Sequence, residues 1–281
     1  MSTPDLRCAA TIMLVREADK GFEVLLLRRN KDLAFAGGAH VFPGGSVDAG
    51  DADPMLLARC VGLTAGEANT RLGVEGALRF YVGALREAFE EAGVLLADRV
   101  DIDLDHELRR QRADLVAGAT SFRAVIERLN LHLDVGALAY VAHWITPEGA
   151  PRRFDTRFFL ARVPFDQRAT PDRSEIVGEV WISPRQALTN YRHGDFELVL
   201  PTVKNLEFLA SFRELDSLMR AARSLPVIES IQPRFYRRSD GTVAVALPGS
   251  REYQKASRTV LAPGEALPTR PVEQSDGSQP K

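Results

Sequence analysis

Hydrophobic residues near the amino terminus fall in two runs, residues 8–15 and 22–28, separated by a short polar stretch. Asp19 and Gly21 within that stretch are typical turn residues, so the two runs are predicted to form a β-hairpin. Strand-like patterns return at residues 138–146, 157–164 and 176–183, and in a late hairpin, residues 234–249, that turns at Asp240–Gly241.

Between these strands, hydrophobic residues recur at intervals of three to four, which is the spacing of a helix. The clearest helix begins near Gly76 and ends before Gly93, with apolar residues at Leu78, Tyr81, Leu85, Ala88, Phe89 and Ala92. Thr64 and Glu67 form a capping-box pattern, which predicts a short helix inside an insertion at residues 52–75. Further helices are predicted at residues 103–116, 121–129, 183–194 and 200–212.

The composition favours a folded domain over a disordered chain, because 45% of the 281 residues are hydrophobic. Strands mixed with helices throughout predict an α/β (α+β) fold with a sheet packed between helices. The formal net charge of −2 does not favour a nucleic-acid or membrane-surface partner. Cys8 and Cys60 are too few for a disulfide framework or a cysteine metal site. We therefore expect a soluble, cytoplasmic protein.

The helix that precedes Gly93 has two chemically different faces. At 100° per residue, Glu87, Glu90 and Glu91 share an arc of roughly 100°, opposite the apolar face. Gly83 falls among these acids, where the absence of a side chain leaves room. Like charges four residues apart destabilise a helix slightly, so the pattern favours a counter-charge such as Mg²⁺. The alternative is a solvated helix face with surplus glutamates.

The segment REAFEEAG, residues 86–93, followed by Val94, resembles the second half of the Nudix box. Ala88 stands where that box has a bulky apolar residue. Gly45 and Asp51 resemble the opening of the box, with Asp in place of the usual Glu. Thirty-four residues separate Asp51 from Arg86, where the usual box has seven, so 27 residues are inserted within the motif.

An insertion at this place resembles one subgroup, the acyl-coenzyme A diphosphatases of the Nudix-19 type. Other segments that look like this subgroup are GAHVFPGGSVDAGD, WITPEGAPRRFDTRFFLA and LPGSREY. The resemblance implies a Nudix-type α/β/α sandwich with a mixed sheet, helical insertions and a C-terminal extension. The implied Nudix domain spans residues 7–212, with an insertion at about 52–75 and extra helices at about 103–130. A C-terminal extension at 213–253, made of a helix and a hairpin, would pack on this domain. Residues 254–281 would form a mobile tail.

The same resemblance implies a hydrolase that uses Mg²⁺ or Mn²⁺ to cleave the diphosphate of coenzyme A or acyl-CoA. The products would be 3′-phospho-ADP and (acyl)phosphopantetheine. One alternative is a Nudix hydrolase of ADP-ribose, NADH or a modified nucleoside triphosphate. Another is a Nudix-fold nucleotide-binding regulator without catalysis. The expected partner is a small-molecule diphosphate, and a homodimer is left open.

Residue roles also follow from the resemblance. It implies that Glu87, Glu90 and Glu91 ligate the metal, with a backbone carbonyl at Gly44 or Gly45 completing the shell. One of these glutamates, or a loop acid, would orient or deprotonate the attacking water. The implied catalytic residues are Glu90, Glu91 and Arg86, with Asp51 as the partner of Arg86 and Glu175 and Glu179 as candidates for an additional acid.

Coenzyme A carries a 3′-phosphate besides its diphosphate, so its site should contain extra cations. Arg28 and Arg29 precede the glycine loop and are candidates for this role. A second cluster contains Arg152, Arg153 and Arg157, of which the last two are the stronger candidates. The alternative for every arginine is a solvated surface charge. The tract HWITPEG, residues 143–149, is a candidate wall for an apolar channel that holds the pantetheine or acyl arm. For Trp144 itself, the pattern favours core packing.

Overall fold

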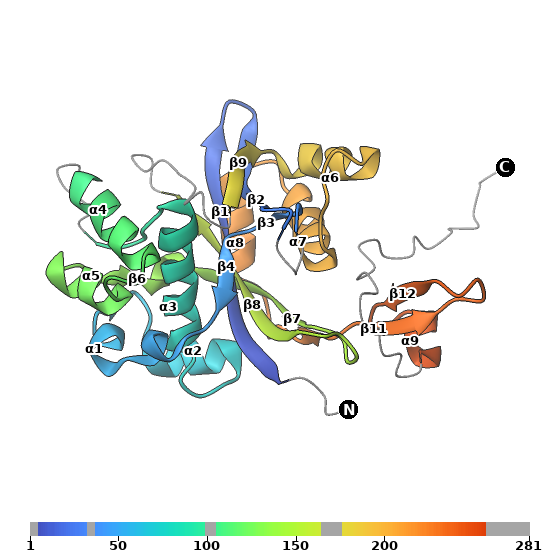
Figure 1. Ribbon diagram of the computed structural model, residues 1–281, viewed down its shortest axis with the longest axis horizontal. Coiled ribbons are helices and arrows are strands. Elements are labelled where there is room, and N and C mark those ends of the chain that lie inside the picture. The colour runs from blue at the N-terminus through green and yellow to red at the C-terminus, as the bar shows by residue number, and fades with distance from the viewer. Residues whose placement is uncertain (1–4, 33–36, 99–104, 164–175, 257–281) are drawn as a thin grey trace.

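The computed structural model describes residues 5–32, 37–98, 105–163 and 176–256 (Figure 1). Its centre is an eight-stranded mixed sheet with the strand order β10-β7-β8-β1-β2-β3, in which β4 also pairs with β1 and β9 with β2. The strands are β1 (Leu6–Ala18), β2 (Gly21–Arg29), β3 (His40–Val41), β4 (Gly44–Ser46), β7 (Ala139–Ile145), β8 (Arg153–Arg162), β9 (Ile176–Ile182) and β10 (Ser230–Ile231).

Helices cover both faces of this sheet, as the α/β/α prediction requires. One layer surrounds α3 (Leu78–Glu87) and contains α1 (Pro54–Leu57), α2 (Ala65–Leu72), α4 (Asp105–Val116) and α5 (Phe122–Arg128) (Figure 1). The other layer contains α6 (Pro184–His193), α7 (Leu200–Ala210) and α8 (Leu215–Arg223). The mixed α/β architecture predicted from the sequence is confirmed.

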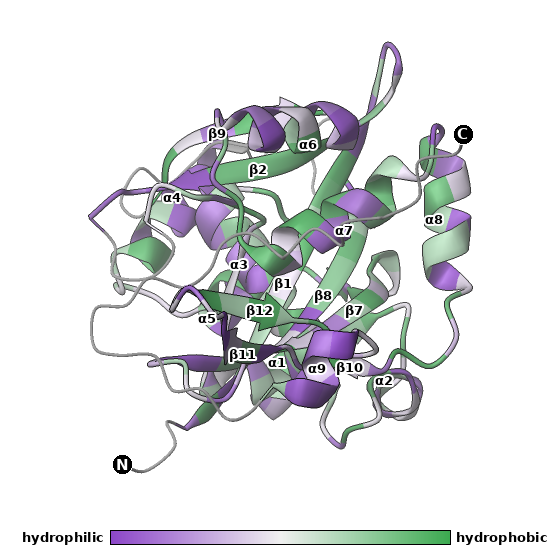
Figure 2. Ribbon diagram, turned by 90° about the vertical axis from the view of Figure 1, so that its right-hand side faces the viewer, coloured by the Kyte–Doolittle hydropathy of each residue, from purple (hydrophilic) through white to green (hydrophobic). Residues whose placement is uncertain are grey.

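Strand β1 shows why the central runs are continuously apolar. Ile12 and Leu14 are buried in the core beneath α3, whereas Met13 and Val15 are buried in the core beneath α7 and α8. Because successive side chains point to opposite faces, a strand covered on both faces needs hydrophobic residues at every position. Figure 2 shows β2 and β8 mostly in the hydrophobic colour, while the surface helix α9 (Arg251–Lys255) is hydrophilic.

The inserted segment folds into several short elements where the sequence predicted one helix. They are a 3₁₀ turn η1 (Ala49–Ala52), α1, a short strand β5 (Cys60–Val61) and α2. The predicted capping box at the start of α2 is confirmed, because the Thr64 amide donates to Glu67 Oε2 at 2.8 Å and the Glu67 amide donates to Thr64 Oγ1 at 3.2 Å. Strand β5 pairs with a second two-residue strand, β6 (Leu133–Asp134).

The residues after 212 pack on the domain through a helix and a strand. Leu215 and Leu218 of α8 are buried in the core beneath β7 and β8, and β10 extends the main sheet next to β7. The predicted late hairpin is present as β11 (Arg234–Arg237) and β12 (Val243–Ala246), with its turn at Asp240–Gly241. Residues 257–281, most of the predicted tail, lie outside the described residues.

Within the described ranges, no helix combines the length and the apolar character needed to cross a bilayer. Cys8 and Cys60 are both free thiols.

Candidate active site

Arg86 is a buried cation that holds three carboxylates together. Its Nε and Nη2 atoms donate to the two oxygens of Asp51 at 2.8 and 3.1 Å. Its Nη1 donates to Glu87 Oε1 and to Glu90 Oε2, both at 2.9 Å. Nη2 also donates to the Ser46 carbonyl oxygen at 2.8 Å. One guanidinium therefore compensates only part of the charge of three acids.

Asp51 reaches Arg86 although it is shorter than the usual Glu. The turn η1 places Asp51 with a 1% exposed side chain, and the Asp48 amide donates to its Oδ2 at 2.8 Å. A Cβ atom on Gly83 would lie 3.0 Å from the same oxygen, so the glycine keeps the helix face open for this carboxylate. The predicted Asp51–Arg86 pair is present.

The acidic helix departs from a regular α-helix at the turn that carries Glu90 and Glu91. Helix α3 ends at Glu87, and residues Ala88–Ala92 form a π-helical turn, η2. This wider turn ends at Gly93, which has φ +70° as its predicted place past the helix end requires. Single π-turns inserted in helices occur frequently at functional sites.

The π-turn directs the acids to different partners. Glu91 Oε2 accepts a hydrogen bond of 2.9 Å from the Gly44 amide, whereas Glu87 and Glu90 bind Arg86. Because Gly44 lies on β4, this bond joins the helix to the glycine loop. The three acids therefore do not share one partner, and the alternative of a solvated helix face does not describe them.

Both glycines of the loop lie very close to neighbouring groups. Strand β4 pairs with β1 so that Gly45 lies opposite Ala10 and Gly44 opposite Thr11. A Cβ atom on Gly45 would lie 2.5 Å from Glu87 Oε1, and one on Gly44 would lie 2.6 Å from Thr11 Oγ1. The Glu87 carboxylate thus lies directly against the backbone of Gly45.

Burial makes the ionised form of these acids costly. Desolvation raises the pKa of Glu87 to about 7, and repulsion from Glu90 adds to this, while Arg86 opposes it. Desolvation likewise raises the pKa of Glu90 against the opposing effect of Arg86. A bound divalent cation would favour the ionised carboxylates.

The donor atoms fit Mg²⁺ or Mn²⁺, because both ions prefer carboxylate and carbonyl oxygens. Glu87 and Glu91 line the same cavity beside Gly44 and Gly45. In the described part of the chain, no three His, Cys, Asp or Glu side chains already surround one cation position. Glu87 and Glu90 instead direct oxygens at Arg86, and Glu91 directs one at the Gly44 amide.

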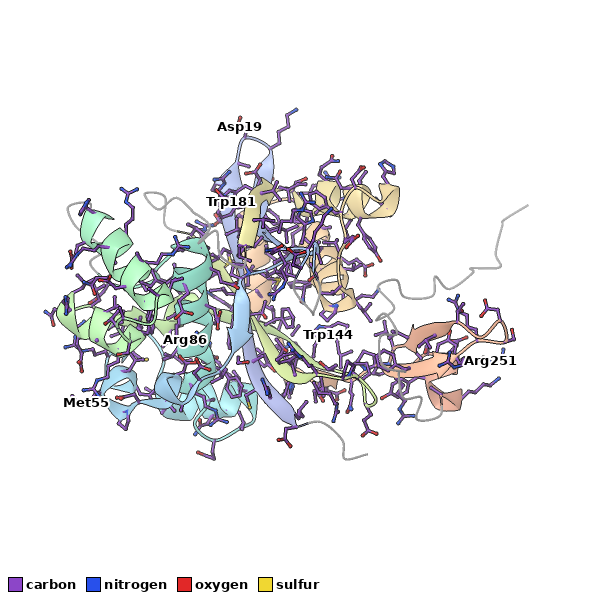
Figure 3. The ribbon with its side chains drawn as sticks, in the orientation of Figure 1. Asp19, Met55, Arg86, Trp144, Trp181 and Arg251 are labelled. Atoms are coloured by element: carbon purple, nitrogen blue, oxygen red, sulfur yellow. The ribbon has the colours of Figure 1, made fainter. Side chains whose placement is uncertain are left out.

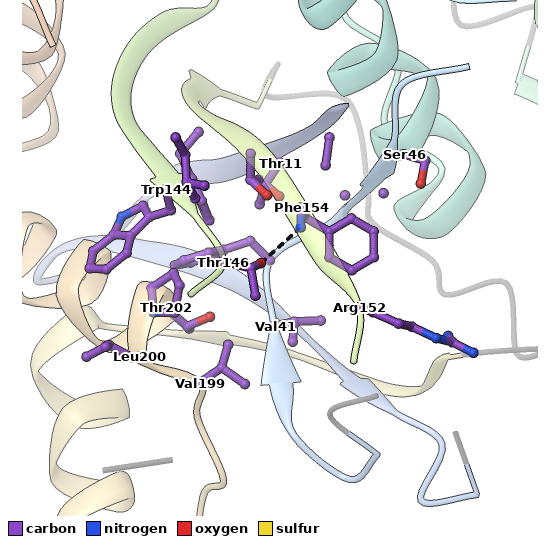
Figure 4. A pocket seen from close by; sticks show the side chains of 18 of the residues that line it. Thr11, Val41, Ser46, Trp144, Thr146, Arg152, Phe154, Val199, Leu200 and Thr202 are labelled. Carbon is purple, nitrogen blue, oxygen red and sulfur yellow. Dashed lines mark hydrogen bonds between the residues drawn. The ribbon is translucent and has the colours of Figure 1, made fainter. Parts of the chain in front are cut away.

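Glu87 and Glu91 line a cavity of about 520 Å³. Figure 4 shows its wall around Trp144, Phe154 and Val199. Arg29 and Arg152 also line it. Much of the remaining wall is apolar and includes Val41, Trp144, Phe154, Phe158, Leu200, Phe235 and Val245. Arg86 on α3 and Trp144 on β7, both labelled in Figure 3, belong to the acidic cluster and the apolar wall, respectively.

The arginines predicted to bind substrate separate into two groups. Arg29 lines the cavity, whereas Arg28 is exposed and lies outside the lining. The other predicted arginines lie on β8, where successive side chains point to opposite faces. Phe154, Thr156 and Phe158 face the cavity, so Arg153 and Arg157 point to the other face.

Arg153 and Arg157 are not among the residues that line the cavity. The guanidinium of Arg157 lies 4.3 Å from the centroid of the Phe80 ring and 2.7 Å from Asp155 Oδ2. Arg153 is buried, and its Nε donates to the Thr146 carbonyl oxygen at 3.3 Å. Neighbouring Arg152 lines the cavity instead.

The structure describes only one of the two additional acids suggested by the sequence. Glu175 lies outside the described residues. Glu179 is exposed on β9, where it pairs in register with Leu27, and it does not line the cavity.

Sequence reasoning missed the contribution of the C-terminal hairpin. Pro233, Phe235 and Val245 line the cavity although they lie more than 140 residues after Glu91. Their local pattern indicates only a hairpin, and no nearby motif connects them to the acids. Asp48 was also missed, and its carboxylate lies 3.8 Å from the guanidinium of Arg86.

The sequence matches a known protein family and its curated members. The family model described as the NUDT19 Nudix domain matches residues 53–209. The chain is 30% identical to human acyl-coenzyme A diphosphatase NUDT19, over 85% of this chain and 74% of that protein. For the chicken protein of the same name the identity is 29%, over 83% and 73%.

A solved structure shows the same fold. The crystal structure of a NUDIX hydrolase from Alicyclobacillus acidocaldarius has a TM-score of 0.61 and 28% identity, covering 80% of this chain and 99% of that one. The family match spans more than half of the chain and includes the acidic helix. The chain therefore belongs to the NUDT19 family of Nudix hydrolases and is a Nudix pyrophosphohydrolase.

Proposed function

We propose that the protein uses Mg²⁺ or Mn²⁺ to hydrolyse the diphosphate of coenzyme A or an acyl-CoA. The products are 3′-phospho-ADP and phosphopantetheine or its acyl form. The observation that carries this proposal is one cavity that joins two carboxylates and a glycine loop to a long apolar wall. The names of the human and chicken relatives support the same substrate class.

The acidic end fits the diphosphate chemistry. A divalent ion bound there supplies positive charge against the phosphate oxygens and acidity to the attacking water. Glu87, Glu90 and Glu91 provide the carboxylates that hold it, and a backbone carbonyl of Gly44 or Gly45 adds a further oxygen. One of the glutamates orients or deprotonates the water. Arg86 keeps Glu87 and Glu90 at fixed positions through its two bonds of 2.9 Å.

The rest of the cavity fits the two arms of the substrate. Arg29 and Arg152 supply positive charge for phosphate groups outside the scissile diphosphate, including the 3′-phosphate. Trp144, Phe154 and Phe235 supply apolar surface for the pantetheine or acyl arm. This arrangement favours a substrate with a charged head and a long, weakly polar tail.

The test is turnover of a panel of diphosphates by the purified protein with millimolar Mg²⁺ or Mn²⁺, with products separated by liquid chromatography and identified by mass. The panel contains coenzyme A, an acyl-CoA, ADP-ribose, NADH and a modified nucleoside triphosphate. Coenzyme A or its acyl form should have the highest kcat/KM and give 3′-phospho-ADP.

Faster turnover of ADP-ribose, NADH or a triphosphate would contradict the substrate assignment and leave the hydrolase assignment intact. Binding of a nucleotide without turnover of any compound, with either metal, would favour a regulator. Glu91→Gln serves as the control that the measured activity belongs to this site.

A further inference from the structure

Arg112 is a buried cation on α4 that contacts the acidic helix from outside the Nudix motif. It is 9% exposed, and its Nε and Nη2 atoms donate to the Glu90 carbonyl oxygen at 3.0 and 2.9 Å. Helix α4 also packs against η2 and α5, within the helical layer that surrounds α3. The contact therefore joins an extra helix to the backbone of a predicted metal ligand.

The end of the helix at Gly93 explains why this carbonyl oxygen accepts an outside donor. In a regular α-helix the Val94 amide would bond to the Glu90 carbonyl, four residues earlier. Here the Val94 amide bonds to Ala88 at 3.2 Å and the Gly93 amide to Phe89 at 3.0 Å. Carbonyl groups in the last turn of a helix need partners from elsewhere. Because Gly93 ends the helix in the left-handed conformation, Val94 lies past the last turn, and Arg112 donates to the Glu90 carbonyl from another helix.

The same turn also carries Glu91. Its carboxylate accepts a hydrogen bond of 2.9 Å from the Gly44 amide, and Glu91 lies within the π-helical segment Ala88–Ala92. A donor that fixes the Glu90 carbonyl therefore fixes the backbone segment that carries both Glu90 and Glu91.

We propose that Arg112 is a positioning residue that holds the π-turn and so presents Glu90 and Glu91 to the metal. The proposal rests on the metal site of the proposed function. Its guanidinium also lies at the carboxyl end of the helix, where a positive charge stabilises the helix dipole. Residues that orient metal ligands typically change metal affinity ~10–100-fold when removed.

The test compares the wild type with Arg112→Ala, Arg112→Lys and a matched control, Arg110→Ala. Arg110 lies on the same helix, is exposed and pairs with Glu107 at 2.6 Å. Mn²⁺ binding is measured directly by electron paramagnetic resonance, and amide hydrogen exchange over residues 88–96 is measured in metal-free protein. Arg112→Ala should bind Mn²⁺ about tenfold more weakly and exchange faster in this segment. Arg112→Lys keeps the charge but presents one donor nitrogen in place of the two that contact the Glu90 carbonyl, so it should recover part of the Mn²⁺ affinity.

Unchanged Mn²⁺ affinity and exchange in Arg112→Ala would overturn the proposal, as would equal losses in Arg110→Ala. If Arg112→Ala does not fold, as judged by circular dichroism, Arg112→Lys carries the same comparison. Activity on coenzyme A is measured separately. If the wild type cleaves none of the diphosphates, the proposed function fails, while the Mn²⁺ and exchange comparisons still decide the role of Arg112.

Discussion

Asp51 and Arg86 form a buried, two-bond ion pair across an insertion within the Nudix motif, with distances of 2.8 and 3.1 Å. The pair closes the inserted segment, because η1 and α3 meet at these two side chains. Arg86 in turn binds Glu87, which lines the cavity, and Glu90, so the position of Asp51 affects both of these acids. The effects that we expect for Asp51→Asn, Gly45→Ala and Glu90→Gln depend on these carboxylates around Arg86.

Asp51→Asn should destabilise the protein and lower turnover. Removing one partner of a buried pair commonly costs about 3–5 kcal/mol. Here Glu87 and Glu90 still compensate Arg86, so we expect a loss of roughly 1–3 kcal/mol in the free energy of unfolding. Urea denaturation measures it, with Asp19→Asn at the exposed tip of the first hairpin as the control. Equal stability of the two variants would contradict a structural role for the pair.

Gly45→Ala should displace the Glu87 carboxylate, because the new Cβ would lie 2.5 Å from Glu87 Oε1. We expect a fall in turnover of at least ~10-fold with the fold retained, since a metal ligand or its neighbour is moved. Gly50→Ala is the matched control, because a Cβ there would meet nothing within 4 Å. Circular dichroism tests whether the fold is retained, and kcat/KM measures the loss of turnover. Wild-type kcat/KM in Gly45→Ala would show that this contact is unimportant.

Glu90→Gln and Glu91→Gln should each lower turnover at least ~10²-fold without unfolding the protein. The amide keeps the shape of the side chain and, in Glu91→Gln, an oxygen that can accept from the Gly44 amide. Only the negative charge and the proton-accepting capacity are lost. Steady-state rates at saturating Mg²⁺ test this, with Glu207→Gln on α7 as the control. Rates near wild type in both variants would remove these residues from the catalytic assignment.

Arg152→Ala should raise the KM for coenzyme A about tenfold, equivalent to about 1.4 kcal/mol of binding free energy. The same substitution should have a smaller effect on 3′-dephospho-CoA, which lacks the phosphate that we assign to the cationic side of the cavity. Arg185→Ala, on the exposed start of α6, is the control. If KM rises equally for both substrates, Arg152 does not bind the 3′-phosphate.

His40 should make the protein less stable as the pH falls below neutrality. Burial, and next the positive charge of Arg28, lower the pKa of His40 from 6.5 to about 4. The unfolded chain therefore takes up a proton before the folded one does. Above pH 6.5 His40 is neutral in both the folded and the unfolded protein and does not lower the free energy of unfolding. As the pH falls from 6.5 to about 4, proton uptake by the unfolded chain lowers that free energy.

The matched variant is His40→Phe, which preserves an aromatic ring against Phe196, now 3.8 Å from the His40 ring. Urea denaturation at pH 7 and pH 5 should show a smaller loss in the variant, by on the order of 1 kcal/mol. An equal loss in both proteins would show that another group is responsible.

The amino-acid sequence by itself determined the features that depend on neighbouring residues. The capping box of Thr64 and Glu67, the helix end at Gly93 and the turn at Asp240–Gly241 all have local chemical causes, and all three are present. The spacing of Arg86 and the three glutamates likewise identified the acidic helix, because its residues lie within two turns of each other. Alternation and helical spacing were sufficient for the mixed α/β architecture.

Only the tertiary structure decided which distant residues meet. The face on which Arg153 and Arg157 lie depends on the register between β8 and β1, and the residues themselves do not encode that register locally. Arg112 and Gly44 contact the π-turn from 22 and 47 positions away along the chain. Phe235 reaches the cavity because the C-terminal hairpin packs there. Such contacts follow from how whole elements pack, so no local pattern could predict them.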